Sequence, residues 1–105
     1  MKRGEIWWAN LESPAGRRPV LLLSRDEAYA VRELVTVAPV TTRQRHIDSK
    51  VPLGIDDGLP KPCVINLDTI TTIAKASLTE RITTLSLEKQ RAAEDALHFA
   101  LGMER

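Results

Sequence analysis

The feature that most constrains this chain is a run of four apolar residues, 20–23, preceded by two arginines and a proline. Four residues are too few for the buried stripe of a helix, but they suit a central β-strand that is buried on both faces. Pro19 fixes its φ at about −65° and biases Arg18 towards an extended backbone, which holds the guanidinium at the mouth of the strand. A charged group cannot enter the core unpaired, so it faces water, a carboxylate or an anionic ligand.

Most of the chain consists of short segments rich in branched and aromatic residues, separated by turns that contain proline or glycine. These segments predict strands at residues 5–11, 19–23, 33–40, 51–53, 63–68 and 69–73 (one or two strands), and 79–83. Pro39 marks the end of its strand, at an edge or a bulge. Residues 41–46 follow as a polar, basic loop. Strict alternation over 63–69 places the odd-numbered side chains on one face.

Two segments carry helix signals. Ser24, with a glutamate three residues later, has the spacing of a capping box and predicts a short helix over residues 26–31. A longer helix is predicted over 87–101, with Ser86 as its N-cap and Gly102 as its left-handed stop. Its apolar stripe consists of Ala93, Ala96, Leu97, Ala100 and Leu101. Several short strands and one packed terminal helix predict an α+β fold, a small and strongly bent antiparallel barrel.

The composition places the chain in a broad class. With 105 residues, 43% hydrophobic and 28% charged, it is predicted to form one domain over residues 1–105. The single cysteine, Cys63, excludes a disulfide framework and favours a reducing compartment. No stretch approaches the ~20 apolar residues of a membrane span, and the first residues do not resemble a signal peptide. We therefore expect a cytoplasmic protein with no membrane partner.

Charge is unevenly distributed although the net charge is only +1. Residues 1–50 hold nine Lys and Arg against six Asp and Glu, whereas residues 51–105 hold six against eight. The basic half contains Arg17, Arg18, Arg43, Arg45 and Lys50, with His46 beside them. A local basic surface makes nucleic acid or another polyanion a candidate partner.

Conventional enzyme motifs are absent from the sequence. Ser24 lacks the Gly-x-Ser-x-Gly frame of a nucleophile elbow. His46 and His98 are far apart and have no metal-ligand spacing, and Cys63 fits a core position. We expect no metal site and no cofactor.

Arg18 and Thr41 are the strongest candidates for chemistry. If the strands at 19–23 and 33–40 are antiparallel neighbours, the start of one lies beside the end of the other. A guanidinium and a hydroxyl then converge at one edge of the barrel. Such a pair suits a phosphodiester, because both groups donate to oxygens on which negative charge develops.

Four ordered motifs resemble the MazF/PemK family of toxin endoribonucleases. RGEIW at 3–7 is similar to the family's opening "RGEIW", and RPVLLLS at 18–24 to its "RPVLVLS". VAPVTT at 37–42 resembles its "VVPVTS", and VINLDTITTI at 64–73 its "V…DQIRTI" strand. The helix at 87–101, ending in Leu-Gly, also matches, so the resemblance covers nearly the whole chain.

The resemblance implies an SH3-like barrel of the MazF/PemK/CcdB type with a C-terminal helix. It implies a type II toxin that acts as a homodimer, is neutralised by a small MazE-like antitoxin in its RNA groove, and cleaves single-stranded RNA without a metal. In the family the ribose 2′-hydroxyl attacks the adjacent phosphate, which leaves 2′,3′-cyclic phosphate and 5′-hydroxyl ends. Arg18 matches the catalytic arginine, and Thr41 matches the residue that holds the scissile phosphate.

Further RNA contacts are expected around this pair. Asp68 matches an acidic position near the groove, either as a positioning partner of Arg18, as a base contact or as a solvated carboxylate. Thr69 and Thr71 replace the usual Gln and Arg of "DQIRTI", so the target sequence of a relative cannot be transferred. The loop at 12–16 lacks the usual "GSE" segment that gates the groove in relatives, so closure of the groove and antitoxin competition are expected to differ. The expected RNA-binding residues are Arg17, Thr42, Arg43, Arg45, His46, Asp68 and Thr69, with Lys50 as a further candidate.

Trp7 and Trp8 are adjacent on one strand and must point to opposite faces. One is expected to fill the core, and the other to lie at an interface or groove. Two alternatives to a nuclease remain: a CcdB-like gyrase poison, which shares the fold but cuts nothing, and a non-catalytic SH3-like binding module.

Overall fold

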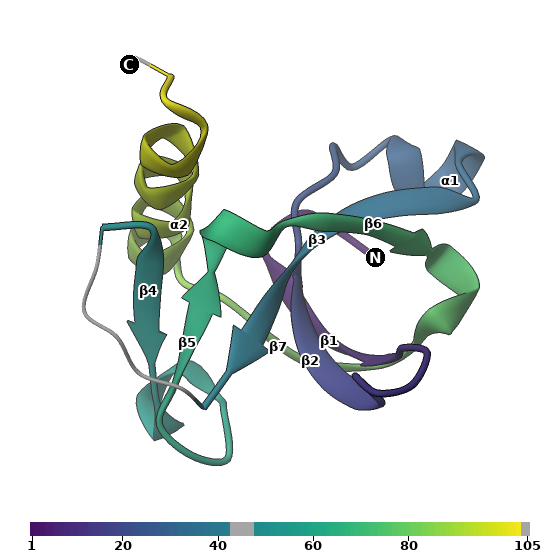
Figure 1. Cartoon of the computed structure of the whole chain (residues 1–105), viewed down its shortest axis with the longest axis horizontal. Helices are drawn as coiled ribbons and strands as arrows, with labels where there is room; N and C mark the ends of the chain where they lie inside the picture. The colour runs from purple at the N-terminus through teal and green to yellow at the C-terminus, as the bar shows by residue number, and fades with distance from the viewer. Residues whose placement is uncertain (43–47, 104–105) are drawn as a thin grey trace.

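The computed structural model describes residues 1–42 and 48–103. Its strands form one antiparallel sheet in the order β4-β5-β3-β2-β1-β7, with β6 paired to β3 (Figure 1). The strands are β1 (Glu5–Asn10), β2 (Arg17–Leu22), β3 (Leu34–Thr41), β4 (Lys50–Leu53), β5 (Cys63–Asn66), β6 (Thr71–Ala74) and β7 (Leu78–Thr84). The helices are α1 (Ala28–Val31), α2 (Leu87–Leu101) and the 3₁₀ turns η1 (Ile55–Asp57), η2 (Leu67–Thr69) and η3 (Lys75–Ser77).

Strand β2 is central, as predicted, because it pairs with β1 on one side and β3 on the other. Its residues Val20, Leu21 and Leu22 are at most 2% exposed. Leu21 belongs to a first core beneath α2, whereas Val20 and Leu22 belong to a second core inside the barrel. One strand therefore supplies both cores by simple alternation.

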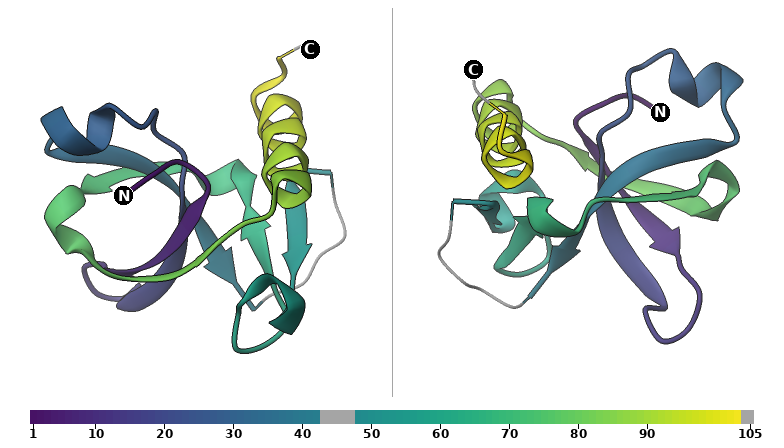
Figure 2. Two further views of the ribbon diagram at one scale, coloured as in Figure 1. Left: turned by 180° about the vertical axis from the view of Figure 1, so that it is seen from behind. Right: turned by 45° about the horizontal axis from the view of Figure 1, so that its top comes forward.

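The two cores lie side by side. In Figure 1 the barrel occupies the right of the view, whereas α2 stands with β4 and β5 on the left. The views from behind and from above in Figure 2 show the same separation. Trp7 packs against the barrel core, which assigns the core role to that tryptophan.

Helix α2 has the predicted bounds and caps. The Ser86 hydroxyl oxygen accepts a hydrogen bond from the Lys89 amide, and Gly102 adopts the left-handed conformation at φ 69°. The predicted apolar stripe also packs on the first core, except that Leu101 is exposed. Among the described residues, no helix is both long and apolar enough to cross a membrane.

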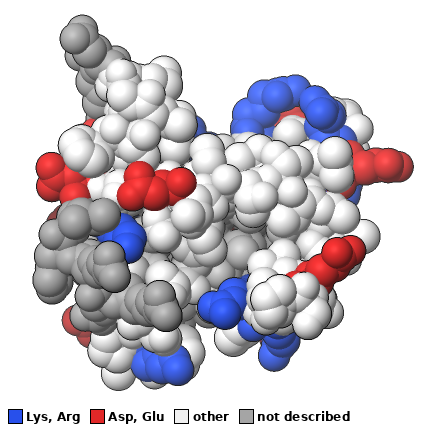
Figure 3. All heavy atoms as spheres, viewed as in Figure 1, with Lys and Arg blue, Asp and Glu red and all other residues white. Residues whose placement is uncertain are grey.

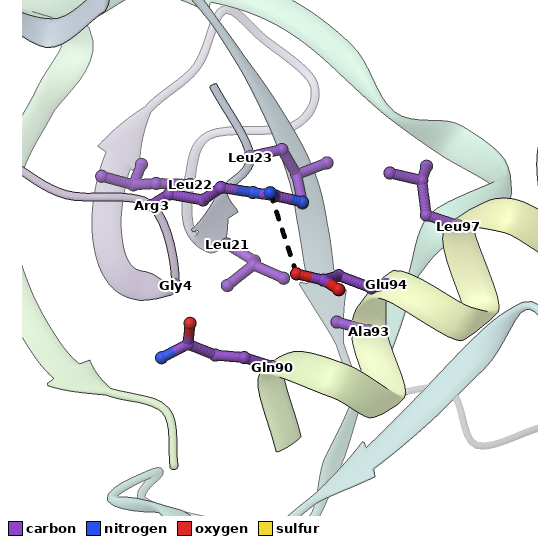
Figure 4. A pocket seen from close by; sticks show the side chains of 9 residues that line it. All are labelled: Arg3, Gly4, Leu21, Leu22, Leu23, Gln90, Ala93, Glu94 and Leu97. Carbon is purple, nitrogen blue, oxygen red and sulfur yellow. Dashed lines mark ion pairs between the residues drawn. The ribbon is translucent and has the colours of Figure 1, made fainter. Parts of the chain in front are cut away.

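The N-terminal segment fastens α2 to the barrel (Figure 4). Gly4 has a φ of 91°, and its carbonyl accepts a hydrogen bond from the Leu85 amide at 3.0 Å. Gln90 donates through Nε2 to the Leu85 carbonyl at 2.8 Å and lies directly against Gly4. Arg3 forms an ion pair with Glu94 of α2 at 3.8 Å, drawn as a dashed line in Figure 4. Arg3 and Gly4 of the RGEIW motif therefore hold α2 against the barrel.

The predicted capping box is wrong. The short helix α1 begins two residues later than expected, and Glu27 is its N-cap without a side-chain hydrogen bond. The Ser24 hydroxyl instead accepts a hydrogen bond from the Thr36 amide at 2.8 Å. A contact with β3 therefore replaces the local cap.

Two strand predictions also need correction. Pro39 does not end β3, which continues through it to Thr41. On one side of β3, pairing with β6 ends at Val37 and pairing with β5 begins at Val40, so Pro39 lies in the gap where no partner requires its missing amide. The alternation over 63–69 stops at Asn66, because η2 replaces the strand from Leu67 onwards.

Candidate active site

Arg18 and Thr41 lie at the edge where β2 begins and β3 ends. Val20 pairs with Pro39, and extending this antiparallel register by two residues places Arg18 opposite Thr41. Arg18 is exposed, and its Nε donates to the Ala15 carbonyl at 2.9 Å. This bond anchors the guanidinium to the turn between β1 and β2 and leaves its two terminal nitrogens directed away from that bond.

A hollow of about 730 Å³, which we call the arginine hollow, opens at this edge. Its polar lining comes from four strands that are neighbours in the sheet, β2, β3, β4 and β5, which supply Arg18, Thr41, Lys50 and Asn66. Lys50 of β4 and Asn66 of β5 are paired residues, so the register brings them to one place. Two cations, a hydroxyl and an amide therefore face the same space, which is the donor set that an anionic ligand requires.

Asn66 has a fixed orientation. Its Oδ1 accepts a hydrogen bond from the Asp68 amide at 3.0 Å, which leaves the amide nitrogen as a donor. The Asp68 carboxylate accepts a hydrogen bond from the buried Ser49 hydroxyl. Asp68 and Thr69 lie on η2, outside the residues that line the arginine hollow. Asp68 therefore supports Asn66 at the end of β5 and does not itself line the arginine hollow.

A second hollow of about 320 Å³, the tryptophan hollow, adjoins the first and shares Ala15, Arg18 and Thr41 with it. The residues specific to it include Trp8, Arg17, Pro19, Thr42, Leu59 and Lys61. The Arg17 guanidinium lies 4.4 Å from the centroid of the Trp8 ring and forms an exposed ion pair with Glu80 at 3.8 Å. Trp8 therefore takes the groove position expected for one of the two tryptophans.

Strand alternation places the two adjacent arginines on opposite faces at the start of β2. Arg18 shares its face of β2 with the barrel-core residues Val20 and Leu22, whereas Arg17 shares its face with Leu21 of the first core. Arg18 lines both hollows, whereas Arg17 lines only the tryptophan hollow.

The remaining predicted residues divide into two groups. Arg17 and Thr42 line the tryptophan hollow. Arg43, Arg45 and His46 lie outside the described residues. Asn66 and Lys61 were not predicted as site residues, because each reaches its hollow only through the β4–β5 register and the connection between those strands. Figure 3 shows Lys and Arg side chains in several separate groups on one face, including along its lower part, rather than in a continuous band.

Cys63 is a core residue, as predicted. It is 5% exposed, and burial, assisted by the nearby Asp57 carboxylate, raises the pKa of its thiol. The neutral form is therefore favoured. Within the described part of the chain, no group of three or more His, Cys, Asp and Glu residues is arranged to hold a metal ion.

Residues 2–101 match the family model of PemK-like, MazF-like toxins of type II toxin–antitoxin systems. The chain belongs to this family. A similar protein is the probable endoribonuclease MazF5 of Mycobacterium tuberculosis, 38% identical over 104 residues that cover 98% of this chain and 94% of the relative. The probable endoribonuclease MazF2 of the same species is 35% identical over 103 residues, covering 97% and 99%.

Solved structures of MazF proteins share the fold. The Mycobacterium tuberculosis toxin MazF-mt6 superposes with a TM-score of 0.88 at 32% identity, covering 96% of this chain and 99% of that one. An endoribonuclease from a mycobacterial species, solved in complex with its cognate antitoxin, also gives 0.88 at 25% identity, covering 100% and 98%. The expected α+β fold, a MazF-type barrel with a C-terminal helix, is confirmed.

In this MazF-like toxin the connection between β1 and β2 is short. It is closed by hydrogen bonds from the Leu11 amide to the Gly16 carbonyl at 2.9 Å and from the Ala15 amide to the Glu12 carbonyl at 3.0 Å. The turn therefore presents the Ala15 carbonyl to Arg18 and forms one wall of both hollows.

Proposed function

We propose that this endoribonuclease toxin cleaves single-stranded RNA in the arginine hollow by attack of a ribose 2′-hydroxyl on the adjacent phosphate. The bond from O2′ to phosphorus forms and the bond from phosphorus to O5′ breaks. The 2′-hydroxyl loses its proton and the departing O5′ gains one, so the products are a 2′,3′-cyclic phosphate and a 5′-hydroxyl. The observation that carries this proposal is the convergence of Arg18, Thr41, Lys50 and Asn66 on one hollow.

Arg18 acts by electrostatic stabilisation. A guanidinium does not release its proton in proteins, so it is a poor base. Its Nε is engaged by the Ala15 carbonyl, which leaves the two terminal nitrogens to donate to the non-bridging phosphate oxygens. These oxygens gain negative charge as the pentacoordinate transition state forms, and donors fixed in advance stabilise that charge more than the ground state.

Thr41 donates its hydroxyl to a phosphate oxygen, and Lys50 and the Asn66 amide bind the flanking backbone. Positive charge from Arg18 and Lys50 neutralises the phosphate, so we expect the reaction to proceed in a chelator.

The partners follow from the family. Because a mycobacterial relative was solved with its cognate antitoxin, we propose that a small antitoxin covers the arginine hollow of this toxin. We also propose that the toxin is a homodimer of single-domain chains and acts in the cytoplasm.

The decisive experiment incubates the purified protein with a long, sequence-diverse single-stranded RNA in EDTA and maps the ends. We expect discrete cuts with 5′-hydroxyl ends from the wild type and none from Arg18→Ala. Arg32→Ala, at an exposed arginine that lines neither hollow, is the matched control and should cut normally. Wild-type turnover in Arg18→Ala would contradict the site. No cutting by the wild type would favour the gyrase-poison or binding-module alternative.

A further inference from the structure

The tryptophan hollow has no part in the chemistry proposed above, yet it shares a wall with the arginine hollow. Arg18 and Thr41 line both. A flexible polynucleotide whose scissile phosphate contacts this pair has its neighbouring nucleotide directly beside the second hollow.

The lining of this hollow suits a nucleobase. Trp8 is only half-buried and presents its ring to the solvent side, where the Arg17 guanidinium lies over it. Pro19 and Leu59 add apolar surface beside the ring. An aromatic face bordered by cations is a common platform for unpaired bases, because any base can stack on it while its phosphates contact the cations.

Arg17 occupies the position that a stacked base would take. The ion pair between Arg17 and Glu80 is exposed, because the Arg17 side chain is 53% exposed and the Glu80 side chain is 72% exposed. Exposed ion pairs are weak, so displacement of Arg17 from the ring costs little. After Arg17 is displaced from the ring, its guanidinium remains next to the edge of the base. The donors that surround the hollow, Arg17, Lys61 and the Thr42 hydroxyl, match acceptor atoms.

We infer that the tryptophan hollow binds the nucleobase adjacent to the scissile phosphate, which stacks on Trp8 in place of Arg17, while Lys61 contacts the next phosphate. Trp8, Arg17 and Lys61 then determine which sequences are cut, whereas Arg18 and Thr41 carry the chemistry. Because the Arg17 guanidinium only donates, the hollow favours a base edge rich in acceptors, such as that of guanine. This inference rests on the proposed cleavage at Arg18.

The test combines single changes in the RNA with single substitutions in the protein. Short RNAs with one mapped cleavage site receive one abasic ribonucleotide at each position around the scissile bond. We expect one adjacent abasic position to lower kcat/KM of the wild type by about 5- to 100-fold, the range of one lost base–aromatic stack. In Trp8→Leu the same abasic change should cost less than about twofold, because the stack is already absent. In Trp8→Phe the abasic nucleotide should again lower kcat/KM, but by less than in the wild type.

A second readout does not depend on turnover. An uncleavable RNA, with 2′-deoxyribose at the scissile nucleotide and 2-aminopurine at the identified position, should lose fluorescence on binding to the wild type but not to Trp8→Leu. Lys61→Met should raise KM about 3- to 10-fold without changing kcat. Arg91→Met on the exposed face of α2 is the matched control and should change neither.

The outcomes separate the two proposals. If the wild type cuts but abasic penalties are the same in wild type and Trp8→Leu at every position, the stacking inference is wrong and the cleavage proposal stands. If Trp8→Leu does not fold, the loss of 2-aminopurine fluorescence on binding is measured with Arg17→Met instead. Equal quenching of 2-aminopurine at the identified position and of 2-aminopurine placed three nucleotides away would overturn the inference. If the wild type cuts nothing, the proposed function itself fails.

Discussion

Arg17 and Arg18 show how much the surroundings of a residue depend on which face of a strand it occupies. Arg17 contacts an indole ring and a carboxylate, whereas Arg18 contacts only a backbone carbonyl among the interactions described above. The terminal nitrogens of Arg18 are the ones available to an anion. Substitutions at these adjacent positions should therefore have different consequences.

Thr41 is predicted to contribute to the chemical step. Thr41→Val retains the branched shape but removes the hydroxyl, so kcat should fall ~10- to 10³-fold, the scale of one lost transition-state donor. Single-turnover cleavage measures this directly. Thr72→Val, on the exposed strand β6, is the control, and full activity in Thr41→Val would limit Thr41 to a structural role.

Asn66 allows its donor and its acceptor to be tested separately. Asn66→Asp keeps the oxygen that accepts from the Asp68 amide, so the melting temperature should change little. It also replaces the donor with a negative oxygen, so binding of an uncleavable RNA should weaken by at least about tenfold, the value of a lost hydrogen bond to a charged group. Asn66→Ala should lose both properties but bind RNA better than Asn66→Asp. Anisotropy titration gives the order, and tighter binding by the aspartate variant would contradict it.

At the scale of the element, the attachment of α2 depends on the backbone at Gly4. Gly4→Ala places a side chain at φ 91° and a methyl group 2.5 Å from the Gln90 Cδ. We expect a loss of ~1–2 kcal/mol from the left-handed conformation alone, with a further loss as Gln90 is displaced from the Leu85 carbonyl.

Two other glycines provide controls for this prediction. Gly16 also has a positive φ, 66°, but nothing lies within 4 Å of an added methyl group, so Gly16→Ala reports the backbone strain alone. Gly54 has neither constraint, and Gly54→Ala should be nearly neutral. Urea unfolding of the three variants should therefore rank Gly4→Ala below Gly16→Ala and Gly16→Ala below Gly54→Ala. Equal losses at Gly4 and Gly16 would show that Gln90 adapts freely.

The elements that the sequence predicted well are those with local signals. Strand β2 follows from Pro19 and its apolar run, and α2 follows from Ser86, Gly102 and a helical stripe. Ser24 and Pro39 were misinterpreted because their environments are set by distant partners, the Thr36 amide for Ser24 and the change from β6 to β5 for Pro39. Rules that use only neighbouring residues in the sequence cannot predict such distant partners.

The same distinction applies to the site. Arg18 and Thr41 were predictable because antiparallel pairing of β2 with β3 suffices to bring them together. Lys61 and Asn66 were not, because they depend on the β4–β5 register and on a connection of irregular structure. The resemblance to MazF proteins supplied the roles, but the shape of the hollows required the folded chain.

At the scale of the whole molecule, Glu5 connects β1, β7 and the N-terminus. Burial alone would raise its pKa, but hydrogen bonds from Trp7 Nε1, the Lys2 amide and Arg81 more than offset this and lower the pKa below 4.5. A lowered folded-state pKa contributes stability that is present above the unfolded value and is lost as the pH falls through the folded value.

Glu5→Gln should therefore be less stable than the wild type at pH 7, by about 1 kcal/mol, the difference between a charged and a neutral hydrogen bond. The difference should shrink as the pH falls below 4.5, because the wild-type carboxylate becomes protonated. Urea denaturation of both proteins between pH 7 and pH 3 measures this. A difference that grows towards acid pH would reverse the sign and contradict the account.

The placement of the two arginines on opposite faces of β2 also affects how such a toxin can diverge. A substitution at position 17 alters the surface beside Trp8 and leaves the backbone and the guanidinium of position 18 in place. If Arg18 carries the proposed reaction and Arg17 the proposed choice of base, selection for a new target can act on one face of the strand while the reaction maintains the other. Duplicated genes could then diverge in the RNA that they cut without passing through an inactive ancestor.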